Sequence, residues 1–109
     1  MMVPYEIYIA YISWGTDGKR RPILFLEKND GYVVAFRITS QYENKSEEIK
    51  RKHFKISDRQ QAGLSKPSYI DTGKKVEFPS ALISPQTPIG KLTENDKLRL
   101  LEFLSMEGL

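Results

Sequence analysis

The chain has 109 residues, no cysteine and a formal net charge of +3, with 28% charged and 11% aromatic residues. This composition excludes a disordered chain, a disulfide framework, thiol catalysis and a thiolate zinc site, and the length predicts one domain, 1–109. No apolar run approaches the ~20 residues of a membrane helix, and we expect a cytoplasmic protein with no signal peptide and no membrane partner.

Three strands are predicted in the first part of the sequence. Residues Tyr5 to Trp14 alternate with a period of two, which is typical of a β-strand. Residues Ile23 to Glu27 are apolar on both faces, as expected for a central strand. The third strand ends at Thr39 and follows Asn29-Asp30-Gly31, whose composition predicts a tight hairpin turn. The hairpin should place the start of the second strand beside the end of the third.

The middle of the sequence is more polar. Residues 42–55 lack a strong apolar period, so we expect a loop that can include a helical turn and leads into a short strand, His53–Ile56. Ser57 to Gln60 has the spacing of a capping box, and Gly63 suits a helix end, which predicts one short internal helix. Two further short strands are expected, at Ser68–Thr72 and Lys75–Phe78.

The end of the sequence predicts a second helix. Thr93 is a good N-cap, acidic residues follow it, and Gly108 fits a stop signal. The predicted core-facing side of this helix is Leu98, Leu101 and Leu104, widened by Leu100 and Phe103. Short strands of this kind close into a small barrel, which hides their edges. The predicted fold is therefore mainly β, with a short internal helix and a C-terminal α-helix.

Cations gather before the second predicted strand. Lys19, Arg20 and Arg21 are consecutive, and Pro22 holds Arg21 in an extended conformation. The planar guanidinium of arginine suits bidentate capture of phosphate oxygens. The same cluster also fits a solvated surface loop, so its meaning depends on what lies beside it.

Polar groups follow at the end of the third predicted strand. Thr39 shares a strand face with Arg37, and Ser40 and Gln41 come next. Alone, Thr39 is an ordinary strand former. Paired with Arg21 across the hairpin, it contributes a hydroxyl to a small site that can grip and orient a phosphodiester.

A second basic stretch runs from Lys45 to Lys55, and the net charge of +3 favours acidic partners such as nucleic acid. His53 is the only histidine, which excludes a His-rich metal site, and its simplest interpretation is a surface residue in a basic segment. The carboxylates form no spaced set, so no metal or other cofactor is expected. The candidate nucleic-acid contacts are Lys19, Arg20, Arg37, Ser40, Gln41, Lys50, Arg51, Lys52 and His53.

The whole chain resembles the PemK/MazF family of toxins in four parts, which occur in the family's order. These parts are the basic Arg-Pro turn and apolar strand Lys19–Leu26, the strand end Thr39-Ser40, the segment Ala62–Asp71, and Ile89–Thr93 leading into an amphipathic helix. The resemblance implies a small SH3-like barrel, usually a homodimer, that is restrained by a small acidic antitoxin.

The resemblance also implies an activity, which is metal-independent, sequence-selective cleavage of single-stranded RNA. The substrate's own 2′-hydroxyl would attack, leaving a cyclic phosphate and a 5′-hydroxyl. The family's catalytic arginine maps onto Arg21 and its catalytic threonine onto Thr39. The residues leave open which group accepts the 2′-hydroxyl proton, because a guanidinium is effectively always protonated.

Two other functions fit the sequence. A non-catalytic toxin on the same scaffold, like the CcdB toxins that bind DNA gyrase, would not need the arginine and threonine pair and would use the C-terminal helix. A plain RNA-binding barrel would use the basic stretches without cleavage. An RNA cleavage assay in EDTA distinguishes an endoribonuclease from both.

Overall fold

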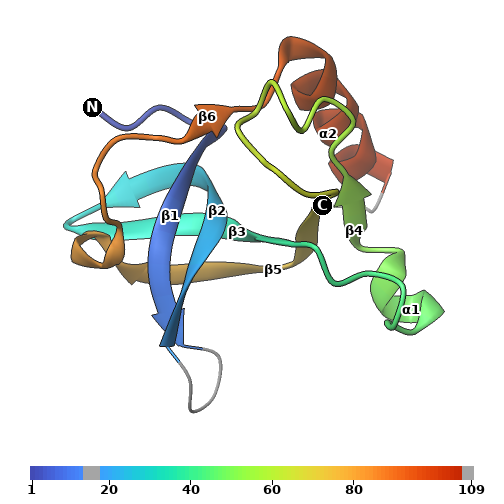
Figure 1. The fold of residues 1–109 in the computed structure, drawn as a ribbon, viewed down its shortest axis with the longest axis horizontal. Coiled ribbons are helices and arrows are strands. Elements are labelled where there is room, and N and C mark those ends of the chain that lie inside the picture. Colours follow the sequence, from blue (N-terminus) through green and yellow to red (C-terminus); the bar gives the residue numbers. More distant parts are fainter. Residues whose placement is uncertain (14–17, 107–109) are drawn as a thin grey trace.

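The computed structural model describes residues 1–13 and 18–106, and within them six strands form one antiparallel sheet (Figure 1). The order across the sheet is β4-β5-β3-β2-β1-β6. The elements are β1 (Glu6–Ser13), β2 (Gly18–Asn29), β3 (Tyr32–Thr39), α1 (Glu47–Lys50), β4 (His53–Lys55), β5 (Tyr69–Pro79), the 3-10 turn η1 (Ser80–Leu82), β6 (Gly90–Lys91) and α2 (Glu94–Met106). No helix among the described residues is long and apolar enough to span a membrane.

The predicted hairpin between β2 and β3 is confirmed. Asp30 and Gly31 have φ angles of 47° and 81°, the left-handed values that a two-residue hairpin turn requires. Asparagine, aspartate and glycine reach this region at the lowest cost, which is why this sequence turns here. The predicted central position of the second strand is also confirmed, since β2 lies between β1 and β3.

Two hydrophobic clusters cover the two faces of the sheet. Residues that are adjacent in the sequence belong to different clusters: Leu24 and Phe36 belong to the first, whereas Ile23 and Ala35 belong to the second. This separation follows from the strand period of two. The first cluster packs against α2 through Leu100, and Figure 1 shows α2 beside β4 at one end of the sheet.

Helix α2 begins as predicted, but its core-facing side differs from the predicted stripe. The Thr93 hydroxyl accepts a hydrogen bond from Asp96 N at 3.2 Å, which confirms the N-cap. Leu98 and Leu101 are 59% and 41% exposed, whereas Leu100 is buried. The expectation that Leu98 and Leu101 face the core is wrong, because a polar anchor at the start of the helix sets its rotation.

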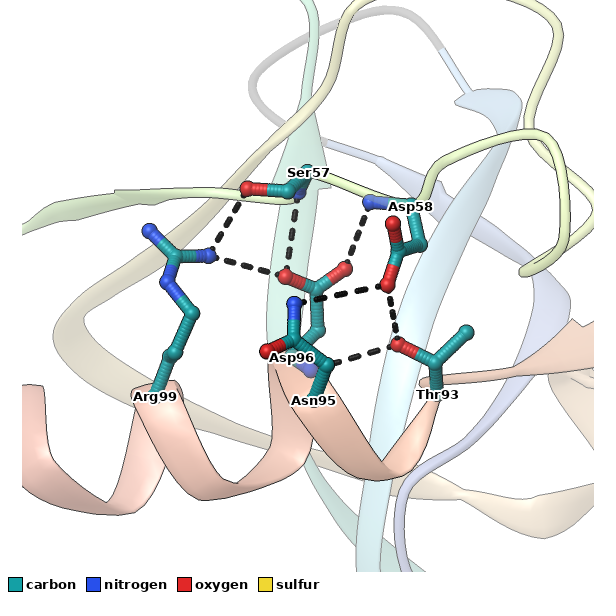
Figure 2. A network of polar contacts seen from close by, with 6 residues as sticks. All are labelled: Ser57, Asp58, Thr93, Asn95, Asp96 and Arg99. Atoms are coloured by element: carbon teal, nitrogen blue, oxygen red, sulfur yellow. Dashed lines mark hydrogen bonds and ion pairs between the residues drawn. The ribbon is translucent and has the colours of Figure 1, made fainter.

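That anchor is Asp96, which is 0% exposed (Figure 2). Its carboxylate accepts from Ser57 N at 3.1 Å, from Asp58 N at 2.7 Å and from Arg99 Nη1 at 2.9 Å. Asp58 in turn accepts from the Thr93 hydroxyl at 2.7 Å. The buried charge is satisfied by these donors, and it ties the segment after β4 to α2.

The predicted internal helix at Ser57–Gly63 is wrong. The structure has turns over 57–63, and the one described helix before it is the single turn α1. The physical reason is that the Ser57 hydroxyl accepts from Arg99 Nη1 at 2.8 Å and the Asp58 carboxylate accepts from the Thr93 hydroxyl, so neither side chain caps a local helix.

Glycines fix where this turn segment meets β6. Gly63 has a φ of 87°, and a Cβ there would overlap the Ile89 carbonyl. A Cβ on Gly90 would likewise overlap the Ala62 carbonyl. Two chain segments therefore touch backbone to backbone, which only glycine permits.

Three further expectations are adjusted by the structure. The two short strands expected at Ser68–Thr72 and Lys75–Phe78 are one strand, β5, which accommodates an irregularity where it pairs with β3. The short strand expected at His53–Ile56 ends at Lys55. Strand β1 begins at Glu6, while Trp14 and the stop signal at Gly108 lie outside the described residues.

Candidate nucleic-acid site

The site begins where the pairing between β2 and β3 ends. The last recorded pair is Ile23 with Arg37, next to Pro22, which has no N–H to give to a ladder. The same register, continued by two residues, sets Arg21 opposite Thr39 on one face of the sheet. The sequence-based expectation that the hairpin brings these two residues together is met by this arrangement.

Arg21 and Thr39 line two adjoining hollows. The first, of about 400 Å³, we call the histidine hollow; it is lined by Arg21, Pro22, Arg37, Ile38, Thr39, Gln41, Lys45, Ile49, His53 and Asp71. The second, of about 380 Å³, we call the loop hollow; it shares Arg21, Pro22, Ile38, Thr39 and Gln41 and adds Ile9, Arg20, Ser40, residues 63–66 and Ile89. The arginine and the threonine therefore stand on the boundary of the two hollows.

Arg21 presents an unused donor. Its Nε atom is buried and has no hydrogen-bond partner among the described residues. A buried N–H without a partner is costly, so it favours an acceptor arriving from outside the chain. A phosphate oxygen is the acceptor that a guanidinium binds best.

The Thr39 hydroxyl is held in place by the chain that follows it. Gln41 N donates to Thr39 Oγ1 at 3.0 Å, a local turn bond typical of threonine. A hydroxyl has two acceptor sites and one hydrogen, so this bond fixes the oxygen and leaves its hydrogen to donate. Thr39 can thus act as an oriented donor at the boundary of the hollows.

Arg37 is paired with a carboxylate that sequence reasoning missed. Arg37 Nη2 donates to Asp71 Oδ2 at 2.8 Å, and Asp71 Oδ1 accepts from Gly73 N at 3.0 Å. The two residues are cross-strand partners on β3 and β5. Nothing in the sequence aligns them, because 34 residues separate them.

Three cations and one carboxylate line the histidine hollow, namely Arg21, Arg37, Lys45 and Asp71. The surplus of positive charge favours an anionic ligand. Lys45 was predicted only as part of the second basic stretch. In the part of the chain that the structure describes, no group of three or more His, Cys, Asp or Glu side chains could hold a metal ion.

The interpretation of His53 as a surface residue is wrong. Its exposed fraction is 8%, and its Nδ1 atom lies 2.9 Å from the carbonyl oxygen of Ile49. His53 is the cross-strand partner of Asp71, and its ring meets Tyr42 edge to face, with 6.1 Å between centroids. It was predicted among the RNA contacts, and it does line the hollow that holds Arg21 and Thr39.

An aromatic pair that the sequence did not indicate lies next to His53. The rings of Tyr42 and Tyr69 are stacked, with 4.1 Å between centroids and an interplanar angle of 4°. Lys50 Nζ lies 5.0 Å from the centroid of the Tyr42 ring. Tyr42 sits in a polar stretch without a period, so only the fold places it against Tyr69 of β5.

The remaining predicted contacts are spread more widely. Arg20 lines the loop hollow, where its Nη2 donates to the Ser84 carbonyl at 3.0 Å, and Ser40 lies on the same wall. Lys50 lies 4.0 Å from Glu43 and 3.8 Å from Glu47. The predicted contacts that line neither hollow are Lys19, Lys50, Arg51 and Lys52.

The fold and the site together define a class, a small protein with one curled antiparallel sheet, a C-terminal helix and a cationic hollow between two neighbouring strands. The structure is similar to that of the Mycobacterium tuberculosis toxin MazF-mt6, with a TM-score of 0.68 and 20% sequence identity over 91% of each chain. The chain therefore has the MazF fold, and the predicted mainly β fold with a C-terminal helix is confirmed. No protein-family model and no curated protein matches the sequence.

Proposed function

We propose that this chain is a MazF-like toxin of a toxin–antitoxin pair, and that it cleaves single-stranded RNA without a metal ion. The observation that carries the proposal is the placement of Arg21 beside Thr39 at the boundary of two hollows. The MazF fold supports it, and so does the resemblance of four sequence segments in the family's order.

In the proposed reaction the 2′-hydroxyl of the substrate attacks the adjacent phosphorus. Charge grows on the phosphorane oxygens, and the guanidinium of Arg21, which lines both hollows, would stabilise it. One such donor typically contributes ~3 kcal/mol to transition-state stabilisation. The Thr39 hydroxyl donates to a phosphate oxygen and orients it.

The two hollows provide room for a strand on both sides of the reacting phosphate. The histidine hollow is next to the Tyr42–Tyr69 pair, and stacking of one base on an aromatic ring contributes ~1–3 kcal/mol. The loop hollow is bounded by Ser40, Gln41, Ser65 and Lys66, whose polar groups can contact base edges. Selectivity for a sequence would come from these two walls.

The proposed partners follow from charge and exposed apolar surface. A small acidic antitoxin would cover the cationic hollow and block Arg21 by occupancy and charge. A homodimer would bury exposed groups such as Tyr11, which is 56% exposed. Co-purification with a small acidic protein, if one is encoded beside this chain, tests the first, and sedimentation at micromolar concentration tests the second.

The experiment that tests the activity uses a single-stranded RNA library in EDTA, followed by mapping of the ends. We expect cyclic phosphate and 5′-hydroxyl ends, and no cleavage where the nucleotide before the scissile bond is 2′-deoxy. Binding without cleavage would contradict the proposal and favour a plain RNA-binding barrel. Loss of cleavage in EDTA would contradict the metal-independent mechanism.

A further inference from the structure

The proposed reaction needs a group that takes the 2′-hydroxyl proton, and the arginine and threonine do not supply it. A guanidinium stays protonated, and a threonine hydroxyl is a donor here, not a base. The other ionisable side chains that line the histidine hollow are Arg37, Lys45, His53 and Asp71. This inference rests on the proposed function and identifies a residue of the same site.

Both carboxylate oxygens of Asp71 already accept hydrogen bonds within the chain. Its Oδ2 accepts from Arg37 Nη2 at 2.8 Å, and its Oδ1 accepts from Gly73 N at 3.0 Å. Both oxygens of this carboxylate are therefore occupied by donors of the chain itself. Arg37 and Lys45 are cations, so His53 is the remaining candidate for a base.

His53 is held in the tautomer that a base needs. A carbonyl oxygen only accepts, so in the 2.9 Å contact with Ile49 O the Nδ1 atom carries the hydrogen. In the neutral ring this leaves the lone pair on Nε2. The contact with Ile49, on α1, and the edge contact with Tyr42 fix the ring plane.

The strand direction aims His53 at the site. Phe54, the next residue of β4, packs edge to face on Phe103 of α2, with 5.6 Å between centroids. Successive side chains of a strand point to opposite faces, so His53 points away from α2, to the face that carries Asp71 and Arg37.

We propose that His53 Nε2 accepts the proton of the attacking 2′-hydroxyl, so that His53 is the general base of the proposed cleavage. The O2′–P bond forms as the P–O5′ bond breaks, and the leaving 5′ oxygen takes a proton from water. The imidazolium then returns its proton to solvent. No oxidant, reductant or metal enters this balance.

Charged groups line the two hollows that His53 borders. Arg21, Arg37 and Asp71 line the histidine hollow from β2, β3 and β5, and Lys45 lines it from the segment before α1. Arg99 and Glu102 of α2 line a third hollow that also borders His53.

The test compares kcat against pH for the wild type, His53→Asn and His53→Gln on one RNA oligonucleotide. The asparagine amide can keep the bond to the Ile49 carbonyl, whereas it lacks a base at the Nε2 position. We expect kcat to fall at least about 100-fold in His53→Asn, with RNA affinity unchanged and the acid limb of the wild-type profile lost. Wild-type kcat with the acid limb retained would overturn the inference.

A second measurement uses the wild-type protein and needs no folded variant. His53 is the only histidine in the sequence, so diethyl pyrocarbonate modifies a single imidazole. We expect loss of cleavage in proportion to modification, and slower modification when RNA is bound. Full activity of a completely modified protein would overturn the inference even if the variants fail to fold.

A substrate with a 5′-thio leaving group shows whether His53 acts as a general base or as a general acid. A thiolate leaves without a proton, so the defect of His53→Asn persists on this substrate if His53 is the base. Full rescue would overturn the assignment as base. A wild-type protein that cleaves no RNA overturns the proposed function together with this inference, whereas a cleaving wild type with an unaffected His53→Asn overturns this inference alone.

Discussion

Arg37 Nη2 lies 2.8 Å from Asp71 Oδ2, and the two residues are register partners on neighbouring strands, β3 and β5. The pair therefore needs no loop to hold it, because the sheet ladder sets the distance. Asp71 turns the Arg37 guanidinium in a fixed direction and supplies the negative charge of the histidine hollow.

Asp71→Asn should separate binding from catalysis. Removing the carboxylate makes the hollow more cationic, so RNA should bind more tightly at low salt. Arg37 loses its charged anchor, and a misplaced site group can lower kcat by up to about 100-fold. Single-turnover rates and affinity would be measured beside Asp30→Asn, an exposed carboxylate in the hairpin turn. Weaker binding with unchanged kcat would contradict this role.

Arg21→Ala should abolish most cleavage while the fold survives. Loss of one donor to the transition state lowers kcat by about 10²–10³-fold, with little effect on RNA affinity because other cations remain. The control is Lys28→Ala, an exposed cation near the other end of the same strand, which should cleave like the wild type. A similar rate for both variants would remove Arg21 from the catalytic site.

Thr39→Val tests the hydroxyl alone, since valine has nearly the shape of threonine. The variant cannot donate to a phosphate and also leaves Gln41 N without its acceptor, so slower cleavage is expected. Thr39→Ser restores both bonds and should restore the rate. If valine and serine behave alike, Thr39 is only a strand residue.

The second basic stretch should contribute to RNA affinity through its charge, and not through contacts within either hollow. Arg51 and Lys52 are exposed and line neither hollow. If both neutralise phosphates, reversing them to glutamate should reduce the slope of log affinity against log salt by about 1.4, at ~0.7 for each single-strand phosphate. Lys28→Glu is the matched reversal away from the site. An unchanged slope would remove this stretch from the RNA path.

Asp96→Ala should cost stability and not chemistry. The change leaves Ser57 N, Asp58 N and Arg99 without their shared acceptor, which should lower the free energy of unfolding by roughly 3 kcal/mol. Glu94→Ala, an exposed acid in the same first turn, should cost under ~1 kcal/mol. Denaturant titration measures both, and equal effects would show that the buried network is not the anchor of α2.

Local patterns were enough to predict the hairpin and the start of α2. Asn29-Asp30-Gly31 encodes its turn through backbone preference, and Thr93 encodes its cap through a hydroxyl, so neither depends on distant residues. The internal helix failed for the opposite reason. The side chains of Ser57 and Asp58 bond Arg99 and Thr93, which lie far along the chain.

The candidate site also contains some contacts that local sequence sets and others that depend on distant strands. Arg21 and Thr39 are joined by a short hairpin, so their proximity could be predicted from register. Asp71, Tyr69 and the burial of His53 depend on β5 and β4, whose pairing no local pattern sets. The exposed Leu98 shows the same limit, because apolar spacing alone does not reveal that a buried aspartate fixes the helix rotation.

The contact between Gly63 and Gly90 has a consequence for altering selectivity. Because backbone meets backbone there, main-chain geometry sets the position of the wall of the loop hollow, and the identity of the side chains on that wall does not. Ser65 and Lys66 belong to that wall, and both are exposed. The two glycines thus fix the main chain independently of the side chains beside it. Ser65 and Lys66 can therefore be randomised to select altered cleavage sequences of the proposed nuclease while the backbone contact beneath them stays constant.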